Sequence, residues 1–380
     1  MTPGEQRTTD FRRFFPERRK PHTYSRGAAI GMMGETTTAS VRTEPVITRY
    51  RGLICDLDGV VYRGATAVPH AVETLNRVTS HGVPVVFATN NASRSPEDVG
   101  ERLRGLGVAP QGWSVVTSSQ AAAAHLAERL PQGAPVCAVG GPGVAQALTE
   151  AGLTPVRVAD LGDTPVEAVV QGLGTDVTWS ELAAVGHLAQ AGATWVATNA
   201  DLTLPTPYGK APGNGALVAL VQTATSASPH VVGKPQAALF DLARSRLGTG
   251  QPETLVCGDR LDTDIEGANS AGLDSLFVLS GACSLRDLAF AERSARPTYV
   301  AADLSGLLAP GLPLHTTAPD CLVGLGPDAL PRVPFVGGNG KRLQSVVATA
   351  WAARDSGRAV CDHTGLWERI ERQLGLVQPE

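Results

Sequence analysis

The sequence predicts an α/β protein in which a parallel sheet, covered by helices, is interrupted by a second α/β domain. Three observations lead to this prediction. Short apolar runs alternate with helical segments from residue 50 onward, a second block with the same alternation occupies about 133–230, and the first pattern then resumes. Strands that alternate with helices form parallel sheets, because each helix carries the chain back to the start of the next strand. A length of 380 residues is enough for two or three domains.

The first part of the predicted core begins with the apolar run Leu53–Cys55, which predicts a strand that ends abruptly at an acidic residue. A helix is predicted at 69–80, and the apolar run Val83–Ala88 predicts the next strand. A further helix is expected to begin at Ser95, because its hydroxyl can cap the first turn and the proline that follows suits the first helical position. The alanine-rich segment Ser118–Leu130 predicts another helix.

The inserted block and the resumed core follow the same pattern. The block contains segments that predict strands near 135–139, 154–158, 166–171 and 194–198 and helices near 143–151, 180–191 and 213–224. The core resumes with a strand at Val231-Val232, a helix over Gln236–Leu247, a strand at Thr254–Cys257, a helix over Thr263–Ala271 and a strand at Ser275–Leu279. We therefore predict a core made of residues 48–132 and 231–308, with residues 133–230 as the inserted domain.

Both ends of the chain differ from this pattern. Residues 1–47 show no sustained periodicity and are expected to be a disordered extension, or an overlong start with Met32 or Met33 as the initiator. They carry basic residues without an apolar segment after them, which argues against a secretory signal. Residues 311–380 begin with a stretch rich in proline and glycine and continue with predicted helices at about 342–355 and 365–374, so they are expected to form a small C-terminal module.

The composition limits the partners and the compartment. The net charge of -4 predicts no surface for nucleic acid, and no apolar run approaches the roughly 20 residues that a membrane span needs. The six cysteines form no Cys-x-x-Cys pair, which argues against a zinc site and favours a reducing, cytoplasmic setting. The composition does not decide the oligomeric state, and a homodimer is left open.

The first motif that carries chemistry is Asp56-Leu57-Asp58-Gly59, directly after a predicted strand. Residues i and i+2 at a strand end point the same way, so Asp56 and Asp58 are expected to share one site. One carboxylate can attack phosphorus as a nucleophile, while the other protonates the leaving oxygen and later deprotonates water. Gly59 lets the chain turn away from the site. A helix cap or a surface acidic pair is the ordinary alternative for this motif taken alone.

Three other polar segments also follow predicted strands. Thr89-Asn90-Asn91 can hold a phosphoryl oxygen, and Lys234 in Gly233-Lys234-Pro235 can neutralise the charge of the phosphoryl group and of the attacking aspartate. In the segment Gly258–Asp264, Asp259 offers a ligand for magnesium and Asp264 can brace the site from behind. Each segment alone has an ordinary alternative: a polar turn, a solvated lysine or an acidic helix cap. Together they are expected to converge, because ligands of parallel sheets bind at the carboxyl ends of strands.

These four motifs, in this order, resemble those of the haloacid dehalogenase superfamily of phosphatases. The α/β insertion between the second and third motifs resembles the cap of the subgroup with NagD-type nucleotidases, p-nitrophenyl phosphatases, phosphoglycolate/glycerol-3-phosphate phosphatases and pyridoxal phosphate phosphatases. The resemblance covers about 48–308. It implies the fold of that superfamily, Asp56 as nucleophile and Asp58 as acid/base. It also implies a Mg²⁺ cofactor held by Asp56, the backbone carbonyl of Asp58, and Asp259.

The segment 197–205 looks like the substrate-specificity loop of this subgroup. Leu204 followed by Pro205 resembles the phosphoglycolate/glycerol-phosphate type, whereas pyridoxal phosphate phosphatases tend to carry histidine at that position. The resemblance therefore favours hydrolysis of glycerol 3-phosphate, with phosphoglycolate and nucleoside monophosphates as alternative substrates. A protein that binds a phosphorylated ligand without turnover is the rival class, although it would be expected to have lost Asp56 or Asp58. Phosphoryl transfer to an acceptor other than water stays open.

Overall fold

The computed structural model describes residues 44–162, 164–206, 208–311, 313–316, 339–360, 362 and 364–376. The predicted N-terminal extension lies outside the described residues up to residue 43. Its last residues, 44–47, are described, and there the short helix η2 (Val46–Arg49) begins. Val46 and Ile47 are buried in the hydrophobic core, so the packed part of the chain starts before residue 47.

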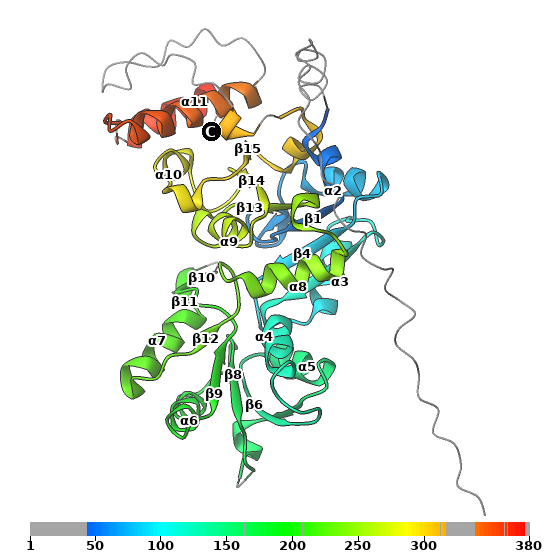
Figure 1. The fold of residues 1–380 in the computed structure, drawn as a ribbon, viewed down its shortest axis with the longest axis vertical. Coiled ribbons are helices and arrows are strands. Elements are labelled where there is room, and N and C mark those ends of the chain that lie inside the picture. The colour runs from blue at the N-terminus through cyan, green and yellow to red at the C-terminus, as the bar shows by residue number, and fades with distance from the viewer. Residues whose placement is uncertain are drawn as a thin grey trace, which may run out of the picture. The chain divides into compact units, whose positions relative to one another are not determined.

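The core is a six-stranded sheet with the order β15-β14-β13-β1-β4-β5, and all its neighbouring strands are parallel (Figure 1). The strands are β1 (Gly52–Cys55), β4 (Val85–Thr89), β5 (Trp113–Thr117), β13 (Thr254–Gly258), β14 (Asp274–Val278) and β15 (Tyr299–Ala301). In the register of the central strands, Cys55 lies beside both Cys257 and Phe87. The predicted α/β fold with a parallel sheet is confirmed, and the ends of β1, β4 and β13 meet at one edge.

Helices cover both faces of this sheet. The helices are α2 (Ala71–Ser80), α3 (Pro96–Gly105), α4 (Ser118–Ala127), α8 (Ala237–Leu247) and α9 (Glu266–Ser270). Leu53 and Cys55 belong to the hydrophobic cluster that contains α2 and α3 residues, whereas Ile54 belongs to the cluster that contains α4, α8 and α9 residues. Alternate residues of a strand point to opposite faces, so an uninterrupted apolar run is needed to bury both. The predicted cap of α3 is confirmed, since the Ser95 side chain accepts a hydrogen bond from the Asp98 backbone N–H at 3.1 Å.

The inserted block forms a second parallel sheet with the order β12-β9-β8-β6-β7. Its strands are β6 (Pro135–Val139), β7 (Thr154–Val156), β8 (Ala168–Gln171), β9 (Thr194–Ala197) and β12 (His230–Val231), and its helices are α5 (Pro142–Glu150), α6 (Trp179–Gln190) and α7 (Asn214–Thr225). Between β9 and α7 the chain makes an antiparallel hairpin, β10 (Thr203–Thr206) with β11 (Gly209–Pro212). This hairpin was not predicted, because its prolines and polar residues give no strand pattern.

Some further elements were also not predicted from the sequence. These are β5 and β15, the hairpin of β2 (Tyr62–Arg63) and β3 (Thr66–Ala67), the helix α10 (Leu285–Ala289), the π-helical turn η5 (Leu261–Ile265), and the short helices η3 (Val158–Asp160), η4 (Gln251–Glu253), η6 (Arg293–Ala295), η7 (Leu304–Leu308) and η8 (Leu314–Thr316). Most are too short to show a period in the sequence. The helix predicted over Thr263–Ala271 is divided between η5 and α9, and this places Asp264 inside the π-helical turn.

The C-terminal helices α11 (Asn339–Asp355) and α12 (Thr364–Gln373) pack on the core next to α10. Trp351 and Trp367 are buried in a cluster that also contains Phe277 of β14 and Leu288 of α10. The indole nitrogen of Trp351 donates a hydrogen bond to the Leu288 carbonyl at 2.8 Å. The predicted proline- and glycine-rich stretch lies mostly outside the described residues.

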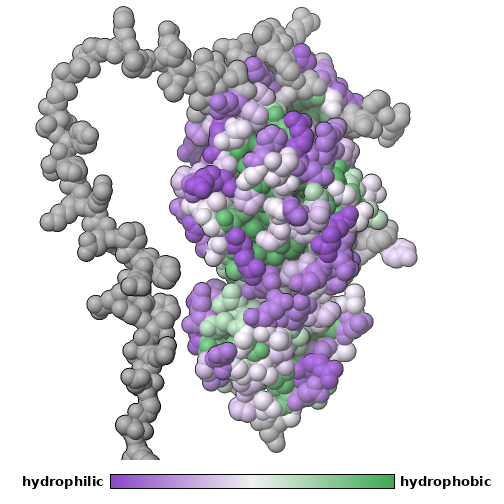
Figure 2. Space-filling model, turned by 90° about the vertical axis from the view of Figure 1, so that its right-hand side faces the viewer, coloured by the Kyte–Doolittle hydropathy of each residue, from purple (hydrophilic) through white to green (hydrophobic). Residues whose placement is uncertain are grey.

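Within the described ranges, no helix is long and apolar enough to cross a membrane. On the face shown in Figure 2, hydrophilic residues surround and interrupt the hydrophobic ones.

Candidate active site

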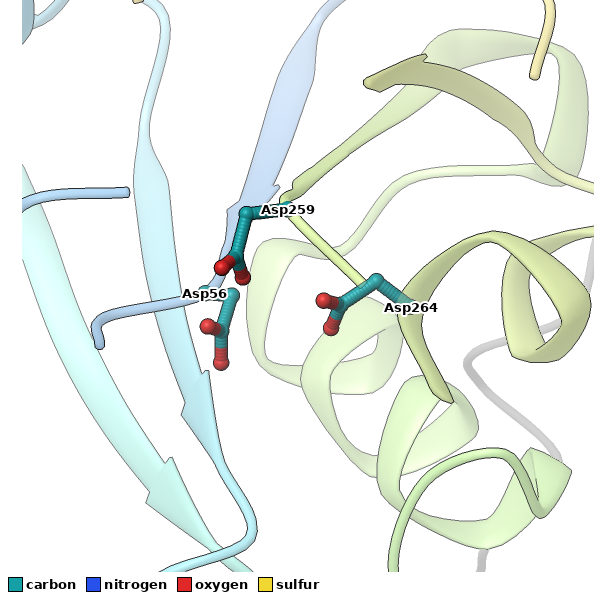
Figure 3. Close-up of side chains that lie close together, drawn as sticks. All are labelled: Asp56, Asp259 and Asp264. Carbon is teal, nitrogen blue, oxygen red and sulfur yellow. The ribbon is translucent and has the colours of Figure 1, made fainter. Parts of the chain in front are cut away.

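Three aspartates meet where β1 and β13 end. Asp56 follows β1, Asp259 follows β13, and Asp264 lies in η5. The backbone N–H of Asp56 donates to the Cys257 carbonyl at 2.9 Å, which continues the β1–β13 ladder up to Asp56. One carboxylate oxygen from each aspartate lies within 4.8 Å of the others, and Figure 3 shows the side chain of Asp264 directed toward the other two. The parallel register therefore brings together residues that are about 200 positions apart in the chain.

Lys234 lies among these carboxylates and is almost fully buried. Its ammonium donates to Asp56 Oδ1, to Asp264 Oδ1 at 2.7 Å, and to the Ala88 carbonyl at 3.2 Å. These three contacts use all three of its hydrogens. Burial alone lowers the pKa of Lys234, but the charges of Asp264 and Asp56 outweigh burial and raise it, so the lysine stays protonated.

The charge balance of the site favours a divalent cation. Three carboxyl groups, of which Asp259 and Asp264 are buried and Asp56 is partly buried, face one ammonium. An excess of negative charge is costly in such a site. Burial, with the charge of Asp264, raises the pKa of Asp259 to about 7. Asp259 Oδ2 accepts a hydrogen bond from the Ala282 N–H at 2.6 Å, whereas Asp259 Oδ1 is buried without a hydrogen-bond partner among the described residues. Mg²⁺ prefers hard oxygen ligands such as carboxylates. Asp259 Oδ1 is such an oxygen, and it has no partner among the described residues.

Asp264 differs from the other two aspartates in how its oxygens are used. Oδ1 accepts from Lys234, and Oδ2 accepts from the Arg260 backbone N–H at 3.1 Å. Asp264 therefore adds negative charge and fixes both Lys234 and the start of η5, while its oxygens are already engaged. A side chain at Gly258 is excluded, because a Cβ there would lie 2.2 Å from the Cβ of Asp264.

Asp58 has a different environment from Asp56. It is an exposed residue beyond the strand end, and its backbone forms an isolated bridge with Tyr62. Partial desolvation of its carboxyl raises its pKa, although the positive charges of Arg102 and Arg94 act in the opposite direction. The next residue, Gly59, has a positive φ of 87°, and a Cβ there would lie 2.2 Å from Asp259 Oδ2, so only glycine fits. Burial also raises the pKa of Asp56, against the charge of Lys234. It is therefore the exposed position of Asp58, outside the cluster around Lys234, that suits it to exchange a proton with a leaving group.

The Thr89-Asn90-Asn91 segment is divided between two tasks. Thr89 Oγ1 accepts a hydrogen bond from the Asn91 N–H at 3.1 Å, which leaves its own hydroxyl hydrogen to donate. Asn91 Oδ1 accepts from the backbone and hydroxyl of Ser93, and the side chain of Asn90 contacts Lys234 and Asp201. Sequence reasoning expected all three residues to bind substrate, and this stays a prediction. In the structure the Asn90 side-chain amide and Asn91 Oδ1 are engaged in protein contacts.

Leu204 is not among the residues gathered around Asp56. It lies on β10, pairs with Ala211 of β11, and its exposed fraction is 37%. The loop 198–202, which leads into β10, does contact the core through Asn90.

Sequence reasoning missed the loop 279–284, which joins β14 to α10 and supports the site from behind. The Ser280 hydroxyl donates to the Gly59 carbonyl at 2.8 Å, and the Ala282 N–H binds Asp259 as described above. A Cβ at Gly281 would lie 1.8 Å from Asp259 Oδ2. The signal was present, because Ser280-Gly281 follows an apolar run in the same way as the four recognised motifs.

Comparisons with known proteins agree with this geometry. A family model described as haloacid dehalogenase-like hydrolase matches residues 53–154, and one described as HAD-hydrolase-like matches residues 231–307. D-glycerol 3-phosphate phosphatase of Mycobacterium tuberculosis is 48% identical over 255 residues, which is 67% of this chain and 70% of that protein. Acid sugar phosphatase of Staphylococcus aureus is 35% identical over 261 residues, 69% of this chain and 98% of that protein.

A solved structure gives the same result at the level of the fold. The glycerol phosphate phosphatase of M. tuberculosis in complex with magnesium superposes with a TM-score of 0.74 at 38% identity. The match covers 88% of this chain and 100% of that chain.

Proposed function

The chain belongs to the haloacid dehalogenase-like hydrolase family, and we propose that it hydrolyses glycerol 3-phosphate with Asp56 as the nucleophile. The predicted family and the predicted enzyme class, a phosphoric monoester hydrolase, are confirmed by relatives that are named phosphatases. The observation that carries the residue assignment is the buried cluster of Asp56, Lys234, Asp259 and Asp264 at the end of β1.

We propose the following reaction. Burial raises the pKa of Asp56, and the charge of Lys234, which binds one oxygen of this carboxyl, acts in the opposite direction and favours the ionised form. The second oxygen is left to attack phosphorus. The new bond joins Asp56 to phosphorus while the bond from phosphorus to the glycerol oxygen breaks, and Asp58 gives its proton to that oxygen. Asp58 then takes a proton from water, whose oxygen attacks phosphorus and releases inorganic phosphate and free Asp56. The Thr89 hydroxyl is placed to donate to a phosphoryl oxygen.

The predicted Mg²⁺ cofactor is confirmed by the fit between the donor set of this site and the magnesium complex of the M. tuberculosis structure. We propose that Asp56, the backbone carbonyl of Asp58, and Asp259 hold it. When bound, the ion neutralises the charge of the carboxylates and of the phosphoryl oxygens. Asp264 keeps its hydrogen bonds to Lys234 and to the Arg260 backbone N–H, and it thereby fixes the position of the Lys234 ammonium.

Glycerol 3-phosphate is proposed as substrate on two grounds. The M. tuberculosis relative acts on D-glycerol 3-phosphate, and its identity of 48% exceeds the 35% of the sugar phosphatase. Leu204 offers a compact apolar surface without a hydrogen-bonding group. The retention of both Asp56 and Asp58 supports an enzyme over a non-hydrolytic binding protein.

The test is phosphate release with excess Mg²⁺ from a panel of both enantiomers of glycerol 3-phosphate, glycerol 2-phosphate, phosphoglycolate, nucleoside monophosphates, a sugar phosphate and pyridoxal phosphate. We expect the highest kcat/KM for an enantiomer of glycerol 3-phosphate. A higher value for another compound would replace the proposed substrate. Binding without phosphate release from any compound would support the rival class.

Leu204 provides a test of where specificity is set. Because the core residues contact the phosphoryl group that all substrates share, discrimination has to come from another part of the chain. We expect Leu204→His to change the kcat/KM ratio between glycerol 3-phosphate and pyridoxal phosphate by about ten- to a few-hundred-fold in favour of the aromatic substrate. Leu220→His, an exposed change on α7, is the matched control and should leave the ratio unchanged. A constant ratio in the Leu204 variant would remove Leu204 from the substrate pocket.

The remaining proposals concern organisation. We propose that 48–132 with 231–308 is the catalytic core, that 133–230 is the cap, and that 311–380 is an added module. A cytoplasmic location is proposed because the buried thiols of Cys55, Cys137 and Cys257 are free. A homodimer stays a prediction that light scattering can check.

A further inference from the structure

We propose that Asn90 and Asp201 form a positioning link that couples the loop 198–202 to Lys234. This loop leads into the β10–β11 hairpin. The link therefore joins the hairpin that bears Leu204 to the ammonium group of Lys234 beside Asp56. The inference rests on the proposed role of Lys234 in the reaction of Asp56, but not on the identity of the substrate.

The side chain of Asn90 holds Lys234 by its backbone. Asn90 Oδ1 accepts from the Lys234 N–H at 2.8 Å, and Asn90 Nδ2 donates to the Lys234 carbonyl at 3.1 Å. These two bonds fix the peptide groups on both sides of the Lys234 Cα. The base of the lysine side chain is fixed with them, and its Nζ reaches Asp56 and Asp264 from there. A shift of Asn90 therefore moves the ammonium group.

The second hydrogen of the Asn90 amide binds the loop 198–202. Asn90 Nδ2 donates to Asp201 Oδ2 at 3.1 Å, and this bond is strengthened by the charge of the carboxylate. A second contact runs the other way, because Asn199 Nδ2 donates to the Asn90 carbonyl at 2.8 Å. Asn199 Oδ1 also accepts from the Asp201 N–H at 3.2 Å. One asparagine thus ties together the end of β4, the loop 198–202 and Lys234.

The loop has little freedom to move independently of this link. Asn214, at the start of α7, donates to the Asn199 carbonyl at 2.9 Å. A Cβ at Gly215 would lie 2.1 Å from the Ala200 carbonyl oxygen, and one at Gly213 would lie 2.2 Å from that of Asp201. On the core side, a Cβ at Gly233 would lie 2.3 Å from the Thr198 carbonyl oxygen. Backbone packs against backbone on both sides of the loop, so displacement of β10 is transmitted to Asn90.

This arrangement gives Asn90 and Asp201 a role that does not require contact with substrate. A substrate that fits the hairpin leaves the Asn90–Asp201 bond intact and Lys234 in place. A substrate that displaces the hairpin strains this bond and misplaces the ammonium, which slows attack by Asp56. The link predicts losses in kcat rather than in KM, because small errors of position at a reacting centre affect the chemical step most strongly.

The test uses Asn90→Ala, Asp201→Ala and the double variant in the full chain, assayed with glycerol 3-phosphate and with p-nitrophenyl phosphate. Each single change is expected to lower kcat by about 10- to 100-fold on both substrates while KM changes by less than about threefold. The kcat of the double variant should be close to that of the less active single variant, because both changes break the same connection. Asp201→Asn retains an acceptor oxygen and is expected to recover part of kcat.

Asn76→Ala is the matched control. Asn76 also bridges two backbone groups, as a donor to the Gly107 carbonyl at 3.0 Å and as an acceptor from the Ala109 N–H at 2.7 Å, but it lies on α2, outside the contacts around Asp56. Asn76→Ala should lower the thermal midpoint without changing kcat.

A rise in KM at constant kcat for Asp201→Ala would make Asp201 a substrate ligand and overturn the link. Losses that multiply in the double variant, or an equal loss in Asn76→Ala, would also overturn it. If glycerol 3-phosphate is not a substrate, only the proposed substrate fails, and p-nitrophenyl phosphate still reports on the link.

Discussion

Asp56→Asn is expected to remove phosphatase activity while the fold remains. An amide cannot form the bond to phosphorus that a carboxylate forms, and it does not bind a divalent cation as strongly. Loss of a nucleophile in an enzyme with a covalent intermediate lowers kcat by a factor on the order of 10⁴ to 10⁶. The change is nearly isosteric, and the amide oxygen can still accept from Lys234. Phosphate release and the thermal midpoint should be measured on the same preparation.

The control for this variant is Asp241→Asn. Asp241 is an exposed residue on α8 that pairs with Arg244, so its loss removes a carboxylate of the same type without touching the site. We expect full activity there. Intact-protein mass after acid quench should detect a phosphorylated form of the wild type and none of Asp56→Asn. Turnover near the normal rate in Asp56→Asn would remove Asp56 as the nucleophile.

The positions of the main site residues could be predicted from the sequence because the fold is a parallel sheet. Asp56 and Asp259 each follow a short apolar strand, and parallel strands that pair in register end at the same edge. Lys234 was the harder case. It follows a strand of only two residues, β12, which pairs with β9 of the inserted sheet and not with the core. Its place next to Asp56 was suggested by the order of the motifs, and the structure shows the contact directly.

The direction of individual side chains could not be predicted. A polar segment after a strand can face a ligand or another loop, and nothing in Thr89-Asn90-Asn91 indicates that the Asn90 amide would face Asp201. This contact depends on a loop more than 100 residues later in the chain. The loop 279–284 was missed for a related reason. It acts through the backbone N–H of Ala282 and through the absence of a side chain at Gly281, and neither group belongs to a recognisable catalytic residue type.

The C-terminal helices show another limit of sequence reasoning. Their existence was predictable from the apolar residues on α11 and α12, but their partner was not, because an apolar face does not specify what covers it. They pack against α10, where the Leu285 N–H donates to Glu371 of α12 at 3.0 Å. Leu285 directly follows the loop that supports Asp259. The two helices thus add to the packing behind the loop that supports Asp259.

Asp259→Asn is expected to weaken magnesium binding and to abolish most activity at moderate Mg²⁺ concentrations. The change removes one negative charge from the cluster and replaces a carboxylate with a poorer ligand, while the shape that packs on Gly281 is retained. Loss of groups that merely orient metal ligands costs about 10- to 100-fold in affinity, so loss of a ligand should cost at least that much. Binding should be measured by calorimetry, with Asp241→Asn as the control that keeps wild-type affinity.

The thermal midpoint gives a second readout that is independent of catalysis. A ligand that binds only the folded state adds about 2.7 kcal/mol at a concentration of 100 Kd, so Mg²⁺ should raise the midpoint of the wild type and raise that of Asp259→Asn much less. Without metal we expect the thermal midpoint of the wild type to be no higher than that of Asp259→Asn. At pH 8, above the pKa of about 7 for Asp259, this carboxyl carries a negative charge beside Asp264 in a buried site, and the variant lacks that charge. The metal-free variant should therefore melt at or above the wild type. If the variant is less stable without metal and gains as much from Mg²⁺ as the wild type, Asp259 supports the fold and does not hold the ion.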